Sequence, residues 1–384
     1  MKYGCNPHQN PSSIYTIKGT EEPFKVLNGT PGYINLLDAL NAYQLVKECR
    51  ESLNLPAAAS FKHVSPAGVG LAVPLTDLEK QAYEVDADLS GLALAYVRAR
   101  NADPMCSYGD FAAMSDVVDV ETAKKLKFEV SDGIIAPGYE PEALEILKTK
   151  KSGQYVILQA NPDYKPPEME YREVYGVVFA QKRNDCKITE ATLQQVKTKN
   201  TQLPADAQRD LVLAQIAVKY TQSNSVGFAK NGQMLGIGAG QQSRVDCTKL
   251  AGRKVATWYL RQHPKVNALP FKKDVKKVAR INARVRYIEG DFTEAEKKEW
   301  LNNFESVPEP LTQKEKEEWI SSLKGVSCSS DAFFPFRDGI DTCARFGVSY
   351  VVHPGGSQAD KEVIDAADEY GMVMSFSGLR LFHH

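Results

Sequence analysis

An adjacent lysine and histidine, Lys62 and His63, are the residues of this sequence best suited to carry out a reaction. They follow a run of small and apolar residues at 57–61, which predicts a buried strand, and α/β enzymes place reactive groups where strands end. An imidazole exchanges a proton near neutral pH, and a neighbouring ammonium group stabilises a developing negative charge. The pair therefore predicts a proton-transfer site; the alternative is a surface lysine beside a histidine at the core edge.

A glycine-rich stretch, 236–244, is the second candidate site, because its three glycines let backbone N–H groups approach an anion closely. Arg244 adds a forked donor that suits a phosphate group. The stretch has neither the Gly-Lys-Ser/Thr of a P-loop nor the glycine spacing of a dinucleotide-binding fingerprint. Anion binding and a tight structural turn are therefore both open interpretations.

A third stretch, 329–338, places three phenylalanines around a proline, with an aspartate and an arginine beside them. It predicts either a slot for a flat ring or a loop that packs into the core. The histidines match no zinc pattern such as HExxH, so we expect no catalytic metal. The stretch 261–286 carries nine Lys or Arg residues, but its valines lie at helical spacing and favour a solvated helix face over nucleic-acid binding.

Alternating helix and strand patterns must position these residues, and they predict an α/β fold. Asn35 can cap a helix that continues to Val46 and beyond, with an apolar stripe at helical spacing. Pro66 and Gly68 indicate a loop directly after His63.

The second half of the chain repeats this alternation. Residues 206–220 predict an amphipathic helix, and 225–230 with 233–238 predict a β-hairpin around an Asn-Gly turn. The charge-dense stretch from 264 to about 322 predicts a helical insertion, after which the chain returns to α/β.

Composition restricts the class of protein. The chain has 384 residues, a formal net charge of -1, 43% hydrophobic and 25% charged residues, which is typical of a globular protein of two or three domains. It has no apolar run near the roughly 18 residues that span a bilayer, and its start lacks the apolar core of a signal peptide. Seven cysteines without a CxxC pair favour a reducing compartment. We therefore expect a cytoplasmic protein that binds neither membranes nor nucleic acid.

Several strings across the whole chain are similar to one known family. With them, the chain resembles the formyltransferase half of the bifunctional purine-biosynthesis family that joins AICAR transformylase to IMP cyclohydrolase. The strings are Tyr-Gly-Cys-Asn-Pro-His-Gln at 3–9, Ser-Phe-Lys-His-Val-Ser-Pro-Ala-Gly at 60–68, Ser-Asp-Gly-Ile-Ile-Ala-Pro-Gly at 131–138, Thr-Gln-Ser-Asn-Ser-Val at 221–226, the stretches 236–244 and 330–338, and Leu-Arg-Leu-Phe-His-His at 379–384.

The resemblance implies an activity. A formyl group would pass from the co-substrate 10-formyltetrahydrofolate to the 5-amino group of 5-aminoimidazole-4-carboxamide ribonucleotide (AICAR), giving formyl-AICAR and tetrahydrofolate on the route to IMP. It implies a homodimer with active sites at the subunit interface and no catalytic metal. The family's cyclohydrolase domain has no counterpart in this sequence, so we expect a separate cyclohydrolase partner.

The resemblance also implies a fold: two cytidine-deaminase-like three-layer αβα units with a helical insertion. The first unit would be 1–167, the second 168–262 with 325–384, and the insertion 263–324. The zinc signature of true deaminases, HxE with PCxxC, is absent from the sequence, so the fold would lack that metal chemistry.

Residue roles follow from the matching positions. His63 would be the general base, Lys62 would stabilise the tetrahedral intermediate, and Asn224 would position the reacting groups. The expected substrate-binding residues are Lys2 (where relatives often have Arg), Tyr3, Asn35, Gly109, Asp132, Arg244, Phe333 and Arg380. The expected cofactor-binding residues are Val245, Asp338, Ser357 and Gln358.

Two other classes of function stay open at this point. A deaminase-like hydrolase would need a set of zinc ligands, which the sequence does not display. A non-catalytic RNA-binding or regulatory module could keep the fold, but it would not need Lys62, His63, Asn224 and Arg244 together.

Overall fold

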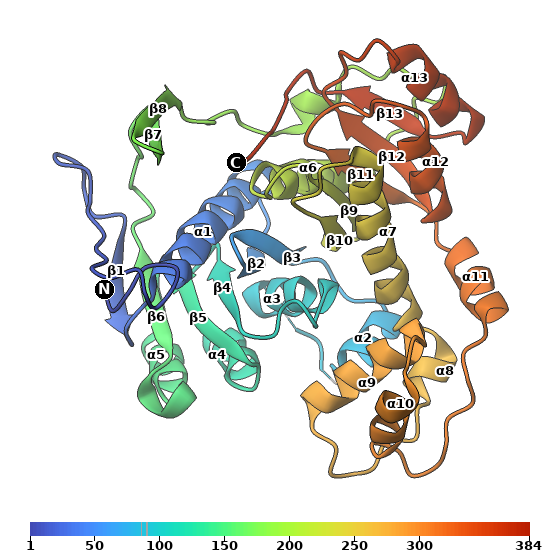
Figure 1. Ribbon diagram of the computed structural model, residues 1–384, viewed down its shortest axis with the longest axis horizontal. Helices are drawn as coiled ribbons and strands as arrows, with labels where there is room; N and C mark the ends of the chain where they lie inside the picture. The colour runs from blue at the N-terminus through green and yellow to red at the C-terminus, as the bar shows by residue number, and fades with distance from the viewer. Residues whose placement is uncertain (86, 90) are drawn as a thin grey trace.

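The computed structural model describes residues 1–85, 87–89 and 91–384 and shows an α/β protein built around one large mixed sheet (Figure 1). The strands of its first half are β1 (Phe24–Asn28), β2 (Ala57–Lys62), β3 (Ser65–Leu71), β4 (Asp110–Met114), β5 (Ser131–Ala136) and β6 (Val156–Ala160). Those of its second half are β9 (Val226–Lys230), β10 (Gln233–Gly238), β11 (Val326–Ser330), β12 (Val348–His353) and β13 (Val373–Phe376). The eleven strands lie in the order β1-β6-β5-β4-β2-β3-β10-β9-β11-β12-β13.

Helices connect and cover these strands. In the first half they are α1 (Tyr33–Leu53), α2 (Asp77–Tyr83), α3 (Gly91–Ala102), α4 (Val120–Lys127) and α5 (Pro141–Lys148). In the second half they are α6 (Ala205–Lys219), α7 (Arg244–Leu260), α12 (Asp338–Arg345) and α13 (Asp360–Glu369). Short 3₁₀ turns lie at Lys150–Gly153 and Glu190–Leu193.

The two halves repeat one order of elements. Apart from α2 in the first half and the helices between α7 and β11 in the second, the first runs α1-β2-β3-α3-β4-α4-β5-α5-β6 and the second runs α6-β9-β10-α7-β11-α12-β12-α13-β13. Each half has an antiparallel hairpin followed by three strands that are parallel to one another. The halves join through β3 and β10, which pair antiparallel, so the sheet is continuous across the molecule.

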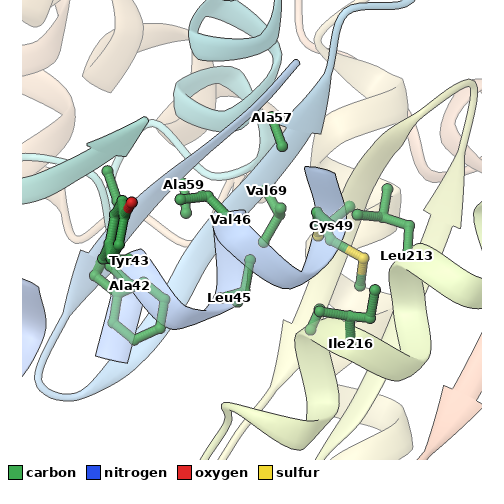
Figure 2. Packing of buried hydrophobic residues seen from close by; sticks show 14 of the residues in the cluster. Ala42, Tyr43, Leu45, Val46, Cys49, Ala57, Ala59, Val69, Leu213 and Ile216 are labelled. Carbon is green, nitrogen blue, oxygen red and sulfur yellow. The ribbon is translucent and has the colours of Figure 1, made fainter. Parts of the chain in front are cut away.

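Helices cover both faces of the sheet. On one face α1 and α6 share a buried cluster with β2 and β3, and Figure 2 shows side chains of α1 such as Val46 and Cys49 among Ala57, Leu213 and Ile216. On the other face α3, α4 and α5 pack on the first half, and α7, α12 and α13 pack on the second. The result is a three-layer arrangement in which helices cover both faces of one sheet, and the ends of neighbouring strands lie along the same edge of that sheet.

Gly68 and Gly236 both lie in strands, which contradicts the loop predicted around Gly68 and agrees with the strand predicted for 233–238. Gly68 belongs to strand β3 rather than to a loop, and a Cβ on it would lie 2.0 Å from the carbonyl oxygen of Ala99 on α3. Gly236 lies in β10, where a Cβ would come within 2.4 Å of the carbonyl oxygen of Ala251 on α7. Both glycines therefore allow a helix to approach the sheet closely, and neither lies in an anion-binding loop.

The β9–β10 hairpin confirms the prediction from its sequence. Asn231 and Gly232 have φ values of 52° and 70°, as a type I′ turn requires.

The prediction that α6 is amphipathic is wrong, because its residues 210–219 are buried without a break. Its one buried amine, on Lys219, is neutralised by Glu48 of α1 at 2.8 Å.

The charge-dense stretch after α7 is helical, as predicted. It contains α8 (Pro264–Asn267), α9 (Lys277–Glu289), α10 (Glu294–Leu301) and α11 (Gln313–Ser321), which enclose an apolar cluster of their own. Two arginines of α9, Arg280 and Arg284, pair with Glu84 at the end of α2, each at 2.6 Å. The basic residues of this stretch thus serve in part to attach it to the first half.

Candidate active site

The turn between β2 and β3 consists of His63 and Val64, whose φ values are 52° and 60°. A two-residue turn with positive φ at both positions normally contains Asn and Gly, and a β-branched valine is strained there. The turn places the exposed His63 at the tip of the hairpin and the half-buried Lys62 at the end of β2. Strain of this kind is found mainly at functional sites.

A buried carboxylate on α1, Asp38, holds this turn. Its Oδ1 accepts a hydrogen bond of 2.6 Å from the backbone N–H of Val64. Burial raises the pKa of Asp38, while the Val64 N–H and the nearby His63 imidazole oppose the increase. One overlooked sign of this role is an acidic residue within the apolar pattern of the helix that follows Asn35.

A cavity of about 350 Å³ opens beside this turn. It lies where the N-terminal segment, the start of α1, the β2–β3 turn and the starts of β4 and β5 meet. Six of the residues predicted from the sequence line it: Tyr3, Asn35, Lys62, His63, Gly109 and Asp132. The structure therefore brings together residues that are up to 129 positions apart between Tyr3 and Asp132.

Local contacts orient the polar groups of this cavity. The Lys62 amine donates to the carbonyl of Tyr108, the residue before Gly109. Gly109 has a φ of +72°, and a Cβ there would lie 3.6 Å from the Lys62 Nζ. Asp132 is paired with Lys151, and both are about half exposed. Lys2 is exposed and precedes Tyr3 in the N-terminal segment.

The start of α1 differs from the prediction. The helix begins at Tyr33, and Asn35 lies inside its first turn rather than capping it. The Asn35 Oδ1 accepts a hydrogen bond of 2.9 Å from the N–H of Gly32, which satisfies one of the free donors at this end. The same side chain faces the cavity, so it combines a local role with a place in the site.

A second polar group forms around Asn224, Arg244 and Asp331, none of which lines the first cavity, although the Gln222 N–H donates to Ser65 Oγ of β3 at 3.3 Å. Arg244 is buried; its Nη2 donates to the Asn224 Oδ1 at 2.8 Å, and its Nη1 donates to Asp331 and to the carbonyl of Ser225. Asp331 also accepts from Ser223 Oγ at 2.6 Å. Arg244 thus points at protein groups and fixes Asn224, and Asp331 is a central residue that the sequence reading missed.

The remaining predicted residues surround this second group or lie farther along the second half. Val245 is in the first turn of α7, and Asp338 begins α12. Ser357 and Gln358 line a cavity of about 690 Å³ together with residues 335–337, which precede α12, and residues of α13. The other two are exposed: Phe333, and Arg380, whose guanidinium lies 4.9 Å from the Phe382 ring centre. Among the described residues, no member of this set lines the first cavity.

His353, in the second half of the sheet, is a structural residue. It is buried, its Nδ1 accepts from the Gly355 N–H at 3.1 Å, and burial lowers its pKa to about 4. In the described part of the chain, no three His, Cys, Asp or Glu side chains form a group able to hold a metal ion.

None of the described helices combines the length and apolar character needed to cross a membrane.

Comparison with known proteins identifies the family. The model of the AICARFT/IMPCHase bienzyme family matches residues 1–254, which contain the first cavity and Arg244. The chain belongs to this family. The family resemblance that the sequence strings indicated is thereby confirmed.

Curated members of the AICARFT/IMPCHase family align along the whole chain. The bifunctional purine biosynthesis proteins PurH of Magnetococcus marinus and Roseobacter denitrificans are each 31% identical to it over 100% of its length. The corresponding protein of Mesorhizobium japonicum is also 31% identical. The chain spans 59% of the length of the first two proteins and 58% of the third.

Proposed function

We propose that this chain is a transferase of purine biosynthesis that moves a formyl group from 10-formyltetrahydrofolate to the 5-amino group of AICAR. The observation that carries the proposal is the position of Lys62 and His63. In a chain of the AICARFT/IMPCHase family, they lie at a strained turn that opens into a cavity with four further residues expected to bind the nucleotide.

The chemistry suits these two residues. The 5-amino group is a poor nucleophile, because its lone pair delocalises into the imidazole and carboxamide. His63 takes a proton from this nitrogen as it attacks the formyl carbon, a contribution of about 10²–10⁴ in rate. The Lys62 ammonium stabilises the resulting oxyanion, worth about 10²–10³. The bond to N10 of the folate then breaks as that nitrogen receives a proton.

Ligand binding is assigned by group. Tyr3, Asn35, Gly109 and Asp132, with Lys2 beside them, would hold the nucleotide in the first cavity. Val245, Asp338, Ser357 and Gln358 would bind the folate, and Asn224 would position the reacting groups. Arg244, Phe333 and Arg380 would complete the nucleotide site. Side chains alone supply each step, and we propose that no metal ion takes part.

We further propose that the enzyme is a homodimer. The residues of the second polar group do not line the first cavity of their own chain, yet the reaction needs both sets at one place. A second copy related by two-fold symmetry would supply the missing set to each cavity. This arrangement would give two equivalent active sites at the subunit interface.

The repeated order of elements supports a division into two cytidine-deaminase-like units. We propose the boundaries 1–167 and 168–262 with 325–384, with 263–324 as the helical insertion. In each proposed unit, a hairpin is followed by three parallel strands with helices on both sides.

An absorbance assay tests the activity. AICAR is mixed with 10-formyltetrahydrofolate, and the formation of tetrahydrofolate is monitored by its absorbance. We expect formyl-AICAR as the product, identified by its mass, and a Lys62→Met control that is slower by at least 10²-fold, in line with the loss of an oxyanion donor of about that worth. Release of ammonia from AICAR or cytidine without formyl transfer would instead support a deaminase-like hydrolase. Absence of formyl transfer from correctly folded protein would overturn the proposal.

A further inference from the structure

A hairpin outside the central sheet exposes an unusual amount of apolar surface. It consists of β7 (Met169–Val174) and β8 (Val177–Lys182), which pair only with each other in the described chain. The side chains of Tyr171, Tyr175 and Phe179 are exposed by 65%, 100% and 60%. Exposed apolar groups gathered in this way mark a surface that contacts another molecule.

The hairpin has regular pairing and a defined turn. Tyr175 and Gly176 have φ values of 52° and 79° and form a two-residue turn. Near the base, Glu170 accepts from Gln181 at 2.6 Å and pairs with Arg183 at 3.3 Å. An isolated two-stranded hairpin is marginally stable in water, so packing against a second surface is needed to hold it firmly.

Apolar residues lie on both faces of the hairpin. Side chains alternate along a strand, so Tyr171 and Val178 share one face, and Val174 and Phe179 share the other. All four are exposed by 47–65%. A ribbon with apolar groups on both faces suits insertion between two surfaces better than contact with one.

A matching apolar surface exists on the same chain. In the N-terminal segment, Ile14, Tyr15 and Ile17 are exposed by 52%, 89% and 52%, and Tyr3 of the same segment lines the first cavity. In Figure 1 the hairpin and the N-terminal segment project on the same side of the molecule. When a projecting group and a receiving surface lie on one chain, two copies can exchange the contact symmetrically.

We propose that the β7–β8 hairpin is an arm that binds a second copy of this chain by packing against the exposed N-terminal segment of that copy. The choice of a second copy as occupant rests on the proposed function, because that function needs residues from two chains at one cavity. The formal net charge of -1 adds little repulsion between copies. The arm would also cover the mouth of the other copy's cavity, where Tyr3 lies.

Sedimentation equilibrium of the full chain over a concentration series tests the arm. The test variant is Tyr171→Ser with Phe179→Ser, which removes one aromatic side chain from each face. Phe128→Ser and Val307→Ser are matched controls, since these side chains are 80% and 76% exposed outside the arm. Tyr175→Ser is a second test variant that cannot disturb the fold, because the side chain is fully exposed.

We expect the wild-type chain and both controls to dimerise alike, and the double variant to dimerise at least about 100-fold more weakly, as loss of two aromatic anchors implies. Tyr175→Ser should weaken the dimer in the same direction. Circular dichroism and thermal unfolding show whether each variant is folded. A folded double variant that dimerises like the wild type, or a wild-type chain that is monomeric throughout, would overturn the proposal.

Formyl transfer by wild type, measured on the same samples, separates the two proposals. If the wild type is active and the arm variants still dimerise normally, the proposal about the arm is wrong and the proposed function stands. If the wild type dimerises through the arm but transfers no formyl group, the proposal about the arm stands and the proposed function is wrong.

Discussion

His63 and Lys62 divide the proposed reaction between a base and a cation, and their substitutions should differ from those of a binding residue. His63→Ala should lower kcat by about 10²–10⁴ with little change in nucleotide affinity, because the base acts mainly in the transition state. Lys62→Met should be at least as damaging. The double variant should be far less than multiplicatively worse, because the two residues serve one step.

Measurement of kcat together with AICAR dissociation constants checks this assignment. Arg244→Ala is the informative comparison, because Arg244 holds Asn224 and Asp331 rather than lying in the first cavity. A His63→Ala variant with near-normal kcat and weakened nucleotide binding would show that another group is the base.

Asp38 should matter through the turn that it holds. Asp38→Ala removes the acceptor of the Val64 N–H and should cost about 1–3 kcal/mol of stability, as an unpaired buried donor does, and lower kcat as His63 loses its position. Asp38→Asn keeps an oxygen acceptor and should be milder. Urea unfolding and kcat are the measurements.

Val64→Gly provides the matched control for Asp38, because glycine adopts a positive φ without strain. Placed in the Asp38→Ala background, it should restore part of the lost kcat. If it restores nothing and Asp38→Asn is as inactive as Asp38→Ala, the charge of Asp38 matters and its hold on the turn does not.

At the scale of elements, attachment of the helical insertion should depend on pH. Burial alone would raise the pKa of Glu84, but hydrogen bonds from Arg280 and Arg284 outweigh it and lower the pKa to about 2. An unfolded glutamate has a pKa near 4.3. The stabilisation is therefore complete above about pH 4.3 and is lost as the pH falls toward 2.

Glu84→Gln removes this contribution and should flatten the change in unfolding free energy over that pH interval. Urea unfolding of the variant and wild type at pH 7, 4 and 3 measures it. Glu289→Gln serves as a control, since Glu289 makes only a long, exposed contact of 3.7 Å with Arg253. Equal pH dependence of wild type and Glu84→Gln would assign the ion pairs no role in attachment.

Element prediction from sequence succeeded where a local pattern determines the backbone and failed where distant contacts do. Asn231-Gly232 fixes its hairpin by its own φ preference. Gly68 makes room for helix α3, which lies farther along the chain, so its local sequence resembles that of a loop. Pro66 and Gly68 indicated a loop near His63, but His63 and Val64 are not themselves turn-forming residue types, and Asp38 supports their turn from another element.

For the molecule as a whole, the sequence indicated candidate site residues but not how the fold groups them in space. Lys62 and His63 join Tyr3, Asn35 and Asp132 in one cavity, whereas Asn224 belongs to the second group around Asp331. Distance along the chain predicts neither grouping. The division is visible only once the sheet has placed the ends of its strands.

Mixing two inactive variants tests whether formyl transfer takes place at one centre built from both groups across two copies. One chain carries Lys62→Met and the other carries Asn224→Ala, and the two are mixed in equal amounts under conditions in which subunits exchange. Random pairing makes half of the dimers mixed, each with one intact site, so about a quarter of wild-type formyl-transfer activity should return. Exchange shown by native mass spectrometry with no gain over the separate variants would contradict the account.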